Sequence, residues 1–410
     1  MHVVLFEGIR WDSFAPLSLT RPVFMAFSGM STLLEKQVRH LQPSRLTLWV
    51  RPQLVDYCRV NVVPNLRVPT KINEPLDDEP ALMMSARTLF LSRYEAPEQE
   101  CVVVDEGNVI RSAFVKRPGL NPDDVMQRTR RWLDLLDLAQ TMPQARLAEY
   151  LWDLIDWNEE ALVADSIAML DCSQRLPAGP YHLINEENIC VAQDVSIAPG
   201  CVIDASKGPI NISRGVSIGA NSVISGPCFI GEYSRIAPLT VVRAGASIGR
   251  VCRGGGEISN SIINNYTNKA HEGYLGDSYV GEWCNLGAGT TTSNVKNTWG
   301  EVTATIGTRE FKTGRRSLGS LIGDHATTSI GTRLTTGCYV GCNCLLAGSG
   351  LVPKFVPSFS FWTQKGMERF DLDKAAEVGR RMFDRRDRAW TALHDQLLRY
   401  AAEAAPIAER

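Results

Sequence analysis

The sequence predicts an α/β N-terminal domain, a left-handed parallel β-helix of hexapeptide repeats, and a C-terminal α-helix. Three observations indicate this order: strand-like and helical segments alternate early in the chain, aliphatic residues then recur every six positions, and a long amphipathic pattern follows the repeat. We expect four parts: residues 1–122 as the α/β domain, 123–190 as a helical linker region, 191–357 as the β-helix, and 358–410 as a tail with a long amphipathic helix.

The six-residue period determines the predicted fold. Aliphatic residues occupy every sixth position from Ile212 to Ile248, and the spacing returns from Ile322 to Val352. This period fits neither the 3.6-residue turn of a helix nor simple strand alternation, but it fits a short strand followed by a corner. Three such units make one triangular coil, and stacking of coils buries the aliphatic side chains.

The segments on either side of the repeat have other patterns. Apolar runs at His2 to Phe6, Leu46 to Val50 and Cys101 to Val104 predict strands, and Ser31 to Leu41 has helical spacing, so an α/β layer fold is favoured. Apolar residues at three- and four-residue steps from Asp123 to about Ala168 predict helices.

The C-terminal pattern predicts one long amphipathic helix from Asp371 to Ala402. One side of this helix is an apolar stripe, and the opposite side carries charges of both signs. We expect it to pack against its own subunit or a neighbouring subunit rather than a membrane.

Composition excludes several classes of partner. The chain has 43 Lys and Arg against 45 Asp and Glu without a dominant block of one sign, so a nucleic-acid partner is not expected. The opening residues lack a signal-peptide pattern and no apolar run reaches membrane-spanning length, so we expect a cytoplasmic protein with no membrane partner. The eleven cysteines form no CxxC pair. We interpret them as free thiols, and Cys338, Cys342 and Cys344 as packing residues rather than metal ligands.

The predicted rhythm breaks twice, and breaks in a rigid scaffold are typical places for binding and catalysis. The first break, Arg250 to Tyr274, includes most of NNYTNKAHEGYLGD (264–277). The second, Thr290 to Ser320, begins with TTTSNVKN (290–297) and continues into a polar excursion.

These residues carry a family resemblance. NKAHEGYLGD and YVGEWCNLGAGTTTSN resemble the histidine and asparagine segments of the bifunctional glucosamine-1-phosphate acetyltransferase and N-acetylglucosamine-1-phosphate uridyltransferase family. A branch of sugar nucleotidyltransferase-like proteins is similar over more of the chain, in GGEISNSII, SLIGDHATTSIGT and SGLVPKFVPSFSF. The resemblance implies that His271 is a general base that takes a proton from a sugar amine. It also implies that Asn294 contacts sugar and acetyl-CoA, where its amide can donate to developing oxyanion charge.

Further site residues follow from the same resemblance. Arg243 and Tyr274 match phosphate-contacting and aromatic positions of the family, and Lys269 and Lys296 lie near enough in sequence to supply a cation to the substrate. Ala347 is expected to line the acyl-CoA site together with Asn294. The family's phosphate-binding lysine corresponds to Ser259 and its tyrosine after the asparagine to Val295, which weakens the case for glucosamine 1-phosphate as the acceptor.

The resemblance also implies an N-terminal domain like a sugar-1-phosphate nucleotidyltransferase, carried by PLSLTRPV, STLLEK and MMSARTLFL. Arg21, Lys36 and Arg87 are candidates for nucleotide binding, and Asp105 for Mg²⁺ if the domain is active. The glycine-rich loop of such enzymes is absent after the first strand, where the chain reads EGIRWDSFAP. A degenerate binding module therefore remains an alternative.

Three functions follow as hypotheses. The first is an acyl-CoA-dependent N-acyltransferase, using acetyl-CoA, that acts on an amino-sugar phosphate or nucleotide sugar in cell-envelope polysaccharide biosynthesis. The second is a sugar-1-phosphate nucleotidyltransferase with a structural β-helix, and the third is a non-catalytic scaffold that binds nucleotide sugars. A homotrimer is expected from the resemblance, since related β-helix acyltransferases build their sites between subunits.

Overall fold

The computed structural model describes residues 1–77, 79–105, 109–138, 146–168, 179–348 and 350–410. The chain divides into two compact units. The N-terminal unit comprises Met1–Phe14, Arg21–Ala26 and Ser31–Glu149, and the β-helix unit comprises Ala15–Thr20, Phe27–Met30 and Tyr150–Arg410.

The N-terminal unit is built around one mixed sheet with the strand order β5-β4-β1-β6-β9-β8. The first four strands are parallel, whereas β9 runs antiparallel to both of its neighbours. The bounds are β1 His2–Phe6, β4 Arg45–Trp49, β5 Thr70–Ile72, β6 Ala81–Ser85, β8 Cys101–Asp105 and β9 Val109–Val115. The three strands predicted from apolar runs are therefore confirmed, and the unit is α/β.

Helix α1 (Leu33–Leu41) confirms the helical pattern that begins near Ser31. Its first turn is fixed by a capping box, in which the Thr32 hydroxyl accepts from the Glu35 N–H and the Glu35 carboxylate accepts from the Thr32 N–H. The unit also contains the short helices α2 (Val55–Tyr57), α3 (Pro122–Met126) and α4 (Arg130–Asp134), and β7 (Thr88–Leu89) pairs with β10 (Arg146–Leu147).

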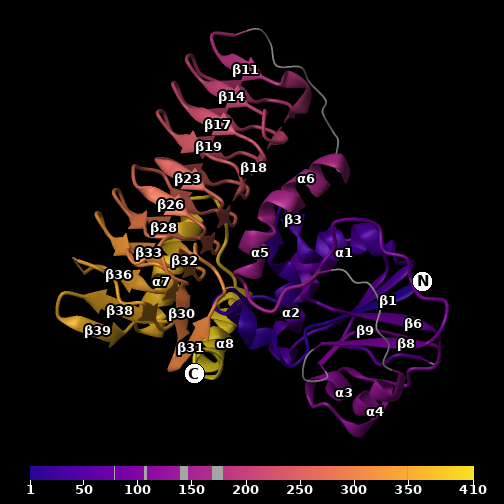
Figure 1. Cartoon of the computed structure of the whole chain (residues 1–410). Helices are drawn as coiled ribbons and strands as arrows, with labels where there is room; N and C mark the ends of the chain where they lie inside the picture. The colour runs from indigo at the N-terminus through magenta and orange to yellow at the C-terminus, as the bar shows by residue number, and fades with distance from the viewer. Residues whose placement is uncertain (78, 106–108, 139–145, 169–178, 349) are drawn as a thin grey trace. The chain divides into compact units, whose positions relative to one another are not determined.

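The β-helix unit contains three long sheets of short parallel strands, as the six-residue period predicts (Figure 1). The first sheet, called the E face, contains β11 His182–Ile184, β14 Val202–Asp204, β17 Val223–Ser225, β20 Val241–Val242, β23 Glu257–Ser259 and β26 Tyr274–Gly276. The second, the D face, contains β12 Ile189–Val191, β15 Ile210–Ile212, β18 Cys228–Ile230, β21 Ala246–Ile248, β24 Ile262–Ile263, β27 Tyr279–Val280, β32 Ser320–Ile322, β35 Cys338–Val340 and β37 Phe355–Val356.

The third sheet, the F face, contains β13 Ser196–Ile197, β16 Ser217–Ile218, β19 Arg235–Ile236, β22 Arg253–Gly254, β25 Asn268–Lys269, β28 Asn285–Leu286, β33 Thr327–Thr328, β36 Leu345–Leu346, β38 Ser360–Thr363 and β39 Gly366–Arg369. Successive strands along the chain pass from face to face, so three strands make one coil. The predicted left-handed β-helix is confirmed.

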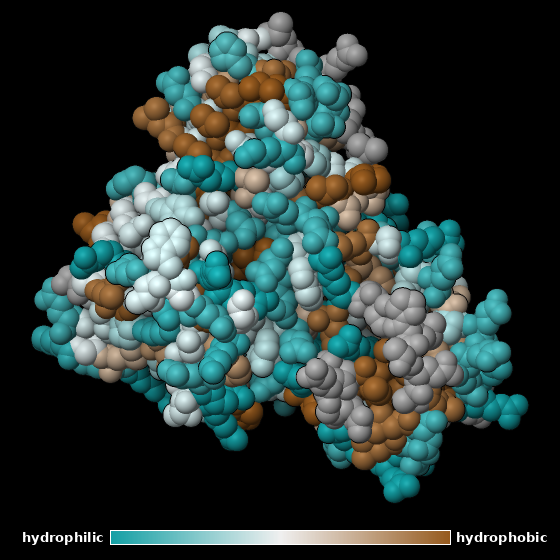
Figure 2. Space-filling view, in the orientation of Figure 1, coloured by the Kyte–Doolittle hydropathy of each residue, from teal (hydrophilic) through white to brown (hydrophobic). Residues whose placement is uncertain are grey.

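Aliphatic side chains fill the inside of the prism. Ile212, Ile218, Ile224, Ile230 and Ile236 are each at most 3% exposed and belong to one continuous core. At the first coil this core is less well covered, because Leu183, Ile189 and Ile197 are half-buried against it. Figure 2 shows hydrophobic surface at this end of the prism, over β11 and β14.

The prediction that the chain leaves the coil from Arg250 to Tyr274 is wrong. Strands β22 to β25 continue the ladders, with Ile236 opposite Gly254 and Gly254 opposite Lys269. Gly254 and Lys269 thus occupy inward positions that aliphatic residues fill elsewhere, which is why the rhythm could not be recognised there. The second predicted break is confirmed, since an antiparallel hairpin of β30 (Thr303–Ile306) and β31 (Arg309–Lys312) leaves the coil after β29 (Thr291–Thr292).

The C-terminal region is helical as predicted, but the expected single helix is two. Helix α7 (Leu372–Asp384) and helix α8 (Ala392–Ala408) are separated by a turn in which Asp387 has a φ of +53°. Thr391 begins α8 in a capping box with His394, and the Trp390 ring lies against Gly379 of α7. Two further helices, α5 (Asp153–Asp156) and α6 (Asn158–Ala168), precede the first coil.

Among the described cysteines, nine are free and buried, including Cys338, Cys342 and Cys344. Burial raises the pKa of the Cys338 and Cys342 thiols to about 12. The expectation of free thiols is wrong for Cys190, which is disulfide-bonded.

Candidate functional site

The E face brings together several of the predicted site residues. Strands β20, β23 and β26 stack in register, so that Val241, Glu257 and Tyr274 lie one above another. Arg243 follows β20, and its Nε donates to Glu257 Oε1 at 2.6 Å. The Arg243 side chain is 58% exposed and that of Glu257 is 37% exposed. Such a solvated pair is weak, so a phosphate group can compete for the guanidinium.

A hydrogen-bonded network connects Tyr274 to Asn294. Asn294 Nδ2 donates to the Tyr274 hydroxyl at 3.2 Å and to Asp277 Oδ2 at 2.5 Å. The other oxygen of Asp277, Oδ1, accepts from Asn260 Nδ2 at 2.7 Å. The predicted residues Tyr274 and Asn294 are therefore in contact, and Asp277 ties both of them to the coil below.

The network fixes which way the Asn294 amide faces. A carboxylate only accepts hydrogen bonds, so the Asn294 nitrogen must face Asp277. Both N–H bonds of Asn294 are then used within the protein. The sequence-based expectation that this amide donates to an oxyanion is not supported by the geometry, because the atom left for a ligand is the carbonyl oxygen Oδ1, an acceptor.

Tyr274 remains a neutral phenol at physiological pH. Burial raises the pKa of its hydroxyl, and the negative charges of Asp277 and Glu257 raise it further, while a hydrogen bond with Ser259 and the Arg243 charge act in the opposite direction. Ser259, which replaces the family's lysine, thus contacts the predicted aromatic residue. A neutral hydroxyl can donate to or accept from a sugar hydroxyl.

His271 lies at the corner that joins the F face to the E face, between β25 and β26. Its side chain is exposed and has no hydrogen-bond partner in the part of the chain that the structure describes. The corner is tight at Gly273, where φ is +113° and an added Cβ would lie 2.2 Å from the Thr290 carbonyl oxygen. The imidazole therefore projects from a fixed backbone near Tyr274.

Lys269 holds this corner from inside the prism. The residue is 1% exposed, and its Nζ donates to three backbone carbonyls: Gly255 at 3.1 Å, His271 at 2.7 Å and Glu272 at 3.3 Å. Burial lowers the pKa of the Lys269 amine to about 8. The expectation that Lys269 binds substrate is not supported by this position, because the amine faces the backbone that carries His271.

Two other predicted residues lie apart from this network. Lys296 Nζ donates to the Glu301 carbonyl at 3.0 Å within the second excursion. Ala347 is exposed and follows β36 on the F face. Asn294 follows β29, which pairs with β34 (Arg333–Leu334) in a separate two-stranded sheet. Within one chain, the two residues predicted to contact acyl-CoA therefore lie on different faces of the prism.

Several neighbouring polar residues were not identified from the sequence. Arg315 in the second excursion donates from Nε to Asp156 at 2.5 Å and from an NH2 group to Asp153 at 2.6 Å. Burial raises the pKa of Asp156, the Arg315 charge lowers it, and Asp277 is close enough to raise it further. Asp277 itself belongs to the YLGD segment, so its place in the resembling segment was a usable signal. Nothing in the short α5 sequence pointed to Asp153 or Asp156.

The predicted nucleotide-binding cations of the N-terminal unit are buried. Arg21 is 5% exposed, Lys36 is 0% and Arg87 is 2%. Nη1 of Arg87 donates to the Ala148 carbonyl at 3.1 Å. Helix α1, which carries Lys36, packs on the adjoining turn through Gln37, whose side chain donates to the Ala86 carbonyl at 3.3 Å. Asp105 ends β8, but its side chain lies outside the described structure. Their proposed roles stay predictions.

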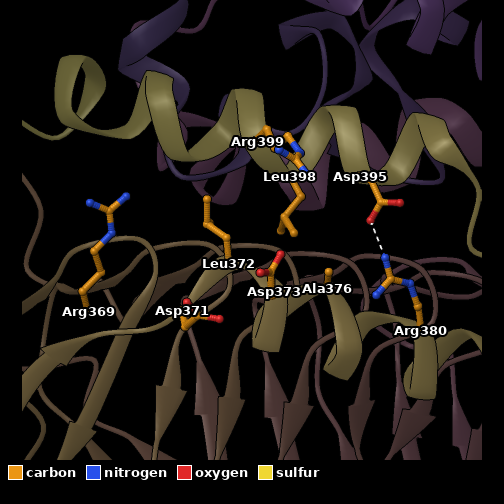
Figure 3. A pocket seen from close by; sticks show the side chains of 9 residues that line it. All are labelled: Arg369, Asp371, Leu372, Asp373, Ala376, Arg380, Asp395, Leu398 and Arg399. Atoms are coloured by element: carbon orange, nitrogen blue, oxygen red, sulfur yellow. Dashed lines mark hydrogen bonds and ion pairs between the residues drawn. The ribbon is translucent and has the colours of Figure 1, made fainter.

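A surface cavity lies elsewhere, between helices α7 and α8 (Figure 3). It has a volume of about 530 Å³, and Arg380 crosses it to Asp395 at 2.8 Å. Arg369, Arg399, Asp371 and Asp373 add further charges of both signs. None of the predicted site residues lines it.

Within the described residues, no group of three or more His, Cys, Asp or Glu side chains is arranged to hold a metal ion. No helix of this described part is both long and apolar enough to cross a membrane.

Comparison with known proteins finds one family model and several sequence relatives. Residues 3–171 match the sugar nucleotidyl transferase family. The chain is 35% identical over 137 residues to the bifunctional protein GlmU of Methanococcus vannielii, which covers 33% of this chain and 32% of that protein. It is 26% identical over 227 residues to GlmU of Synechococcus elongatus, which covers 50% of this chain and 46% of that protein. The chain thus spans between a third and a half of the length of these relatives.

Among solved structures, the Arabidopsis UDP-N-acetylglucosamine acyltransferase is 14% identical and matches 57% of this chain and 93% of that chain, with a TM-score of 0.22. A value this low carries no argument about function. The sequence relatives are informative, and they agree with the resemblance seen in the histidine and asparagine segments. The chain is similar to GlmU proteins over part of its length, and its N-terminal region matches the sugar nucleotidyl transferase family.

Proposed function

We propose that the β-helix unit is an acyl-CoA-dependent N-acyltransferase, using acetyl-CoA, that acts on an amino-sugar phosphate or a nucleotide sugar. The observation that carries this proposal is the exposed His271 on a fixed corner beside the network of Tyr274, Asp277 and Asn294. The GlmU relatives, described as bifunctional, support the same class of chemistry.

In the proposed acyl transfer, Arg243, Asn294 and His271 have different roles. Arg243 binds the phosphate of the acceptor, and the carbonyl oxygen of Asn294 accepts a hydrogen bond from the acceptor amine and orients its lone pair. The amine nitrogen attacks the thioester carbonyl, and a C–N bond forms while the C–S bond breaks. His271 takes the proton from the nitrogen and returns it to the departing thiolate, which yields the amide and free thiol.

We further propose that the active assembly is a homotrimer. The His271 imidazole has no orienting partner in the described part of its own chain, and Ala347 lies on a different face from Asn294. A neighbouring copy can supply both the orienting group and the second wall of an acyl-CoA site. Light scattering on the purified chain tests this, because a monomer at assay concentrations would contradict it.

The acyl-transfer proposal is tested by thiol release from acetyl-CoA in the presence of amino-sugar phosphates and nucleotide-linked amino sugars. We expect His271→Ala to lower kcat/KM by roughly 10²- to 10⁴-fold, the usual contribution of a general base. The matched control is His182→Ala, because His182 is also an exposed histidine on the same β-helix. Turnover in His271→Ala equal to that in the control would overturn the assignment.

A second function is favoured by the family match over residues 3–171. The N-terminal unit would join a sugar 1-phosphate to a nucleoside triphosphate and release pyrophosphate, with Mg²⁺ held near the end of β8 where Asp105 lies. Pyrophosphate release across pairs of sugar phosphates and nucleoside triphosphates in Mg²⁺ tests it. Turnover lost in Arg87→Gln but retained in His271→Ala would assign the reaction to this unit. If nucleotide sugars bind without turnover in either assay, the chain is a scaffold.

A further inference from the structure

Six arginines gather on the F face, at the corner before β22, and on the turn that follows α7. In register along the sheet, Arg235 of β19 lies opposite Arg253 of β22, and Arg253 lies opposite Asn268 of β25. The side-chain oxygen Oδ1 of Asn268 accepts from Nη2 of Arg386 at 2.7 Å. The arginine cluster comprises Arg235, Arg250, Arg253, Arg385, Arg386 and Arg388.

Ring contacts and mutual repulsion show that these side chains converge. The guanidinium carbons of Arg250 and Arg388 each lie 5.7 Å from the centre of the Tyr266 ring. Burial lowers the pKa of Arg386, and the nearby charges of Arg253, Arg385 and Arg235 lower it further. The turn after α7 is therefore pressed onto the arginines of the sheet.

In the described part of the chain, none of the six arginines forms an ion pair with a carboxylate. Arg243, Arg214, Arg315 and Arg380 on the same unit each pair with one. Asp384 and Asp387 in the α7–α8 turn and Glu232 near β19 are exposed and make no such pair. The Nε of Arg253 is buried and lacks a hydrogen-bond partner within this described part.

Like charges held this close are unfavourable, and a buried donor left without an acceptor adds a further cost. A bound anion with several oxygens removes both costs, because its charge offsets the repulsion and its oxygens accept hydrogen bonds. Each guanidinium group can donate two parallel hydrogen bonds to a phosphate group. Arg235 and Arg253 come from neighbouring coils, which lie about 4.8 Å apart. Two long side chains that start from neighbouring strands can both reach one diphosphate group.

We propose that the arginine cluster binds the diphosphate group of a nucleotide ligand. The cluster and the candidate acyl-transfer site share one coil, because Asn268, which contacts Arg386, is followed by Lys269 and then by the corner that carries His271. Asn268 also donates to Asn285 of the next coil at 3.2 Å. The diphosphate belongs either to a nucleotide sugar acceptor or to coenzyme A, and this choice rests on the proposed function.

The test measures binding rather than turnover, using calorimetric titration of the full chain with inorganic pyrophosphate, a UDP-linked amino sugar and coenzyme A. The double variant Arg235→Gln with Arg253→Gln should raise the Kd for pyrophosphate at least about tenfold, since two charge-assisted contacts are removed. The matched control is Arg333→Gln, an exposed arginine of β34 outside the cluster. We expect its Kd to stay within about twofold of the unmodified chain.

Thermal unfolding without ligand provides a second measurement. If the arginines are held close together for a ligand, the double variant should unfold at the same or a higher temperature, because their mutual repulsion is relieved. A lower unfolding temperature together with pyrophosphate affinity equal to that of Arg333→Gln would mean that the arginines are structural, and it would overturn the proposal. Absence of saturable pyrophosphate binding by the full chain would overturn it as well.

The two nucleotide ligands identify the source of the diphosphate. Selective loss of affinity for the UDP-linked sugar in the double variant assigns the cluster to the acceptor, and selective loss for coenzyme A assigns it to the acyl donor. Retained pyrophosphate binding with no thiol release under any condition leaves the cluster standing while the proposed acyl transfer fails.

Discussion

The backbone carbonyl groups at the corners of the regular coils and those at the corner that carries His271 receive their hydrogen bonds from different donors. In two successive regular coils, the residue before the E-face strand has a hydroxyl group: Ser222 precedes β17 and Thr240 precedes β20. The Ser222 hydroxyl donates to the carbonyls of Gly219 at 2.8 Å and Ala237 at 3.0 Å, and the Thr240 hydroxyl donates to Ala237 at 2.6 Å. Side chains at the corner therefore satisfy the corner's own carbonyl groups.

Glycines take these places in the next two coils. Gly256 precedes β23 and Gly273 precedes β26, and neither offers a hydroxyl. The donors come instead from Lys269, whose stem lies where other coils have isoleucine and whose amine reaches the carbonyls of Gly255, His271 and Glu272. The backbone of the corner that carries the exposed imidazole is therefore held from inside the prism.

The largest effect is expected when a lysine is placed in a regular coil. Ile218 has the F-face inward position of Lys269, but the nearby Gly219 carbonyl already accepts from Ser222. Ile218→Lys should lower the free energy of unfolding by at least about 4 kcal/mol, because it buries an ammonium group without partners. Denaturant unfolding measures this, and Ile218→Met, expected to cost less than about 1.5 kcal/mol, is the control.

The reverse change removes the hydrogen bonds that the Lys269 amine donates to the backbone of the corner. Lys269→Met keeps the stem but leaves three carbonyls without their donor, and we expect a loss of about 2 kcal/mol in the free energy of unfolding at pH 7. Acyl transfer should fall as well, because the backbone of His271 is released. A variant as stable as the unmodified chain would show that the lysine is tolerated rather than required.

The pH dependence of this difference follows from the pKa of Lys269, which burial lowers from 10.5 to about 8. Below pH 8 the amine is protonated in both the folded and unfolded chain, so the stability gap to Lys269→Met is constant. Between about pH 8 and 10.5 the unfolded chain binds more protons, so the gap widens in favour of lysine by about 1.4 kcal/mol per pH unit. Unfolding curves at pH 7 and pH 9.5 should show this increase.

The same comparison explains what the sequence could predict. A period of six identified the prism because Ile212 to Ile248 repeat one chemical type at one spacing. It missed the continuation through Gly254 and Lys269, because a search for aliphatic residues does not recognise a glycine and a lysine as inward positions. The inward lysine is possible because its amine finds carbonyls at a corner, which depends on the coil's geometry rather than on local sequence.

The candidate site, like the fold, could be predicted only in part from the sequence. Tyr274 and Asn294 were each expected to be site residues from the family resemblance, and the structure places them in contact. The direction of the Asn294 amide depends on Asp277, and the Asp277 carboxylate in turn holds Asn260 of the preceding coil. Contacts between coils are set by stacking, so residue types and spacing alone could not assign the donor and the acceptor.

The smallest effect on stability is expected at Asp277. In Asp277→Asn the side chain keeps one acceptor oxygen for two amide donors, so either Asn260 or Asn294 loses its partner. We expect a loss of about 1 to 2 kcal/mol in the free energy of unfolding, and the left-handed backbone at this residue should be kept because asparagine tolerates it. Acyl transfer should fall about tenfold, since the Asn294 carbonyl is no longer held toward the acceptor.

Asp194→Asn is the matched control in a regular coil. Asp194 also has a left-handed backbone, and its carboxylate makes an exposed ion pair with Arg214 at 3.2 Å. An exposed pair contributes at most about 1 kcal/mol and no part of the site depends on it. Turnover and unfolding are measured for both variants. Equal turnover in both would mean that the Asp277 network is a structural feature of the coil and does not position Asn294 for the reaction.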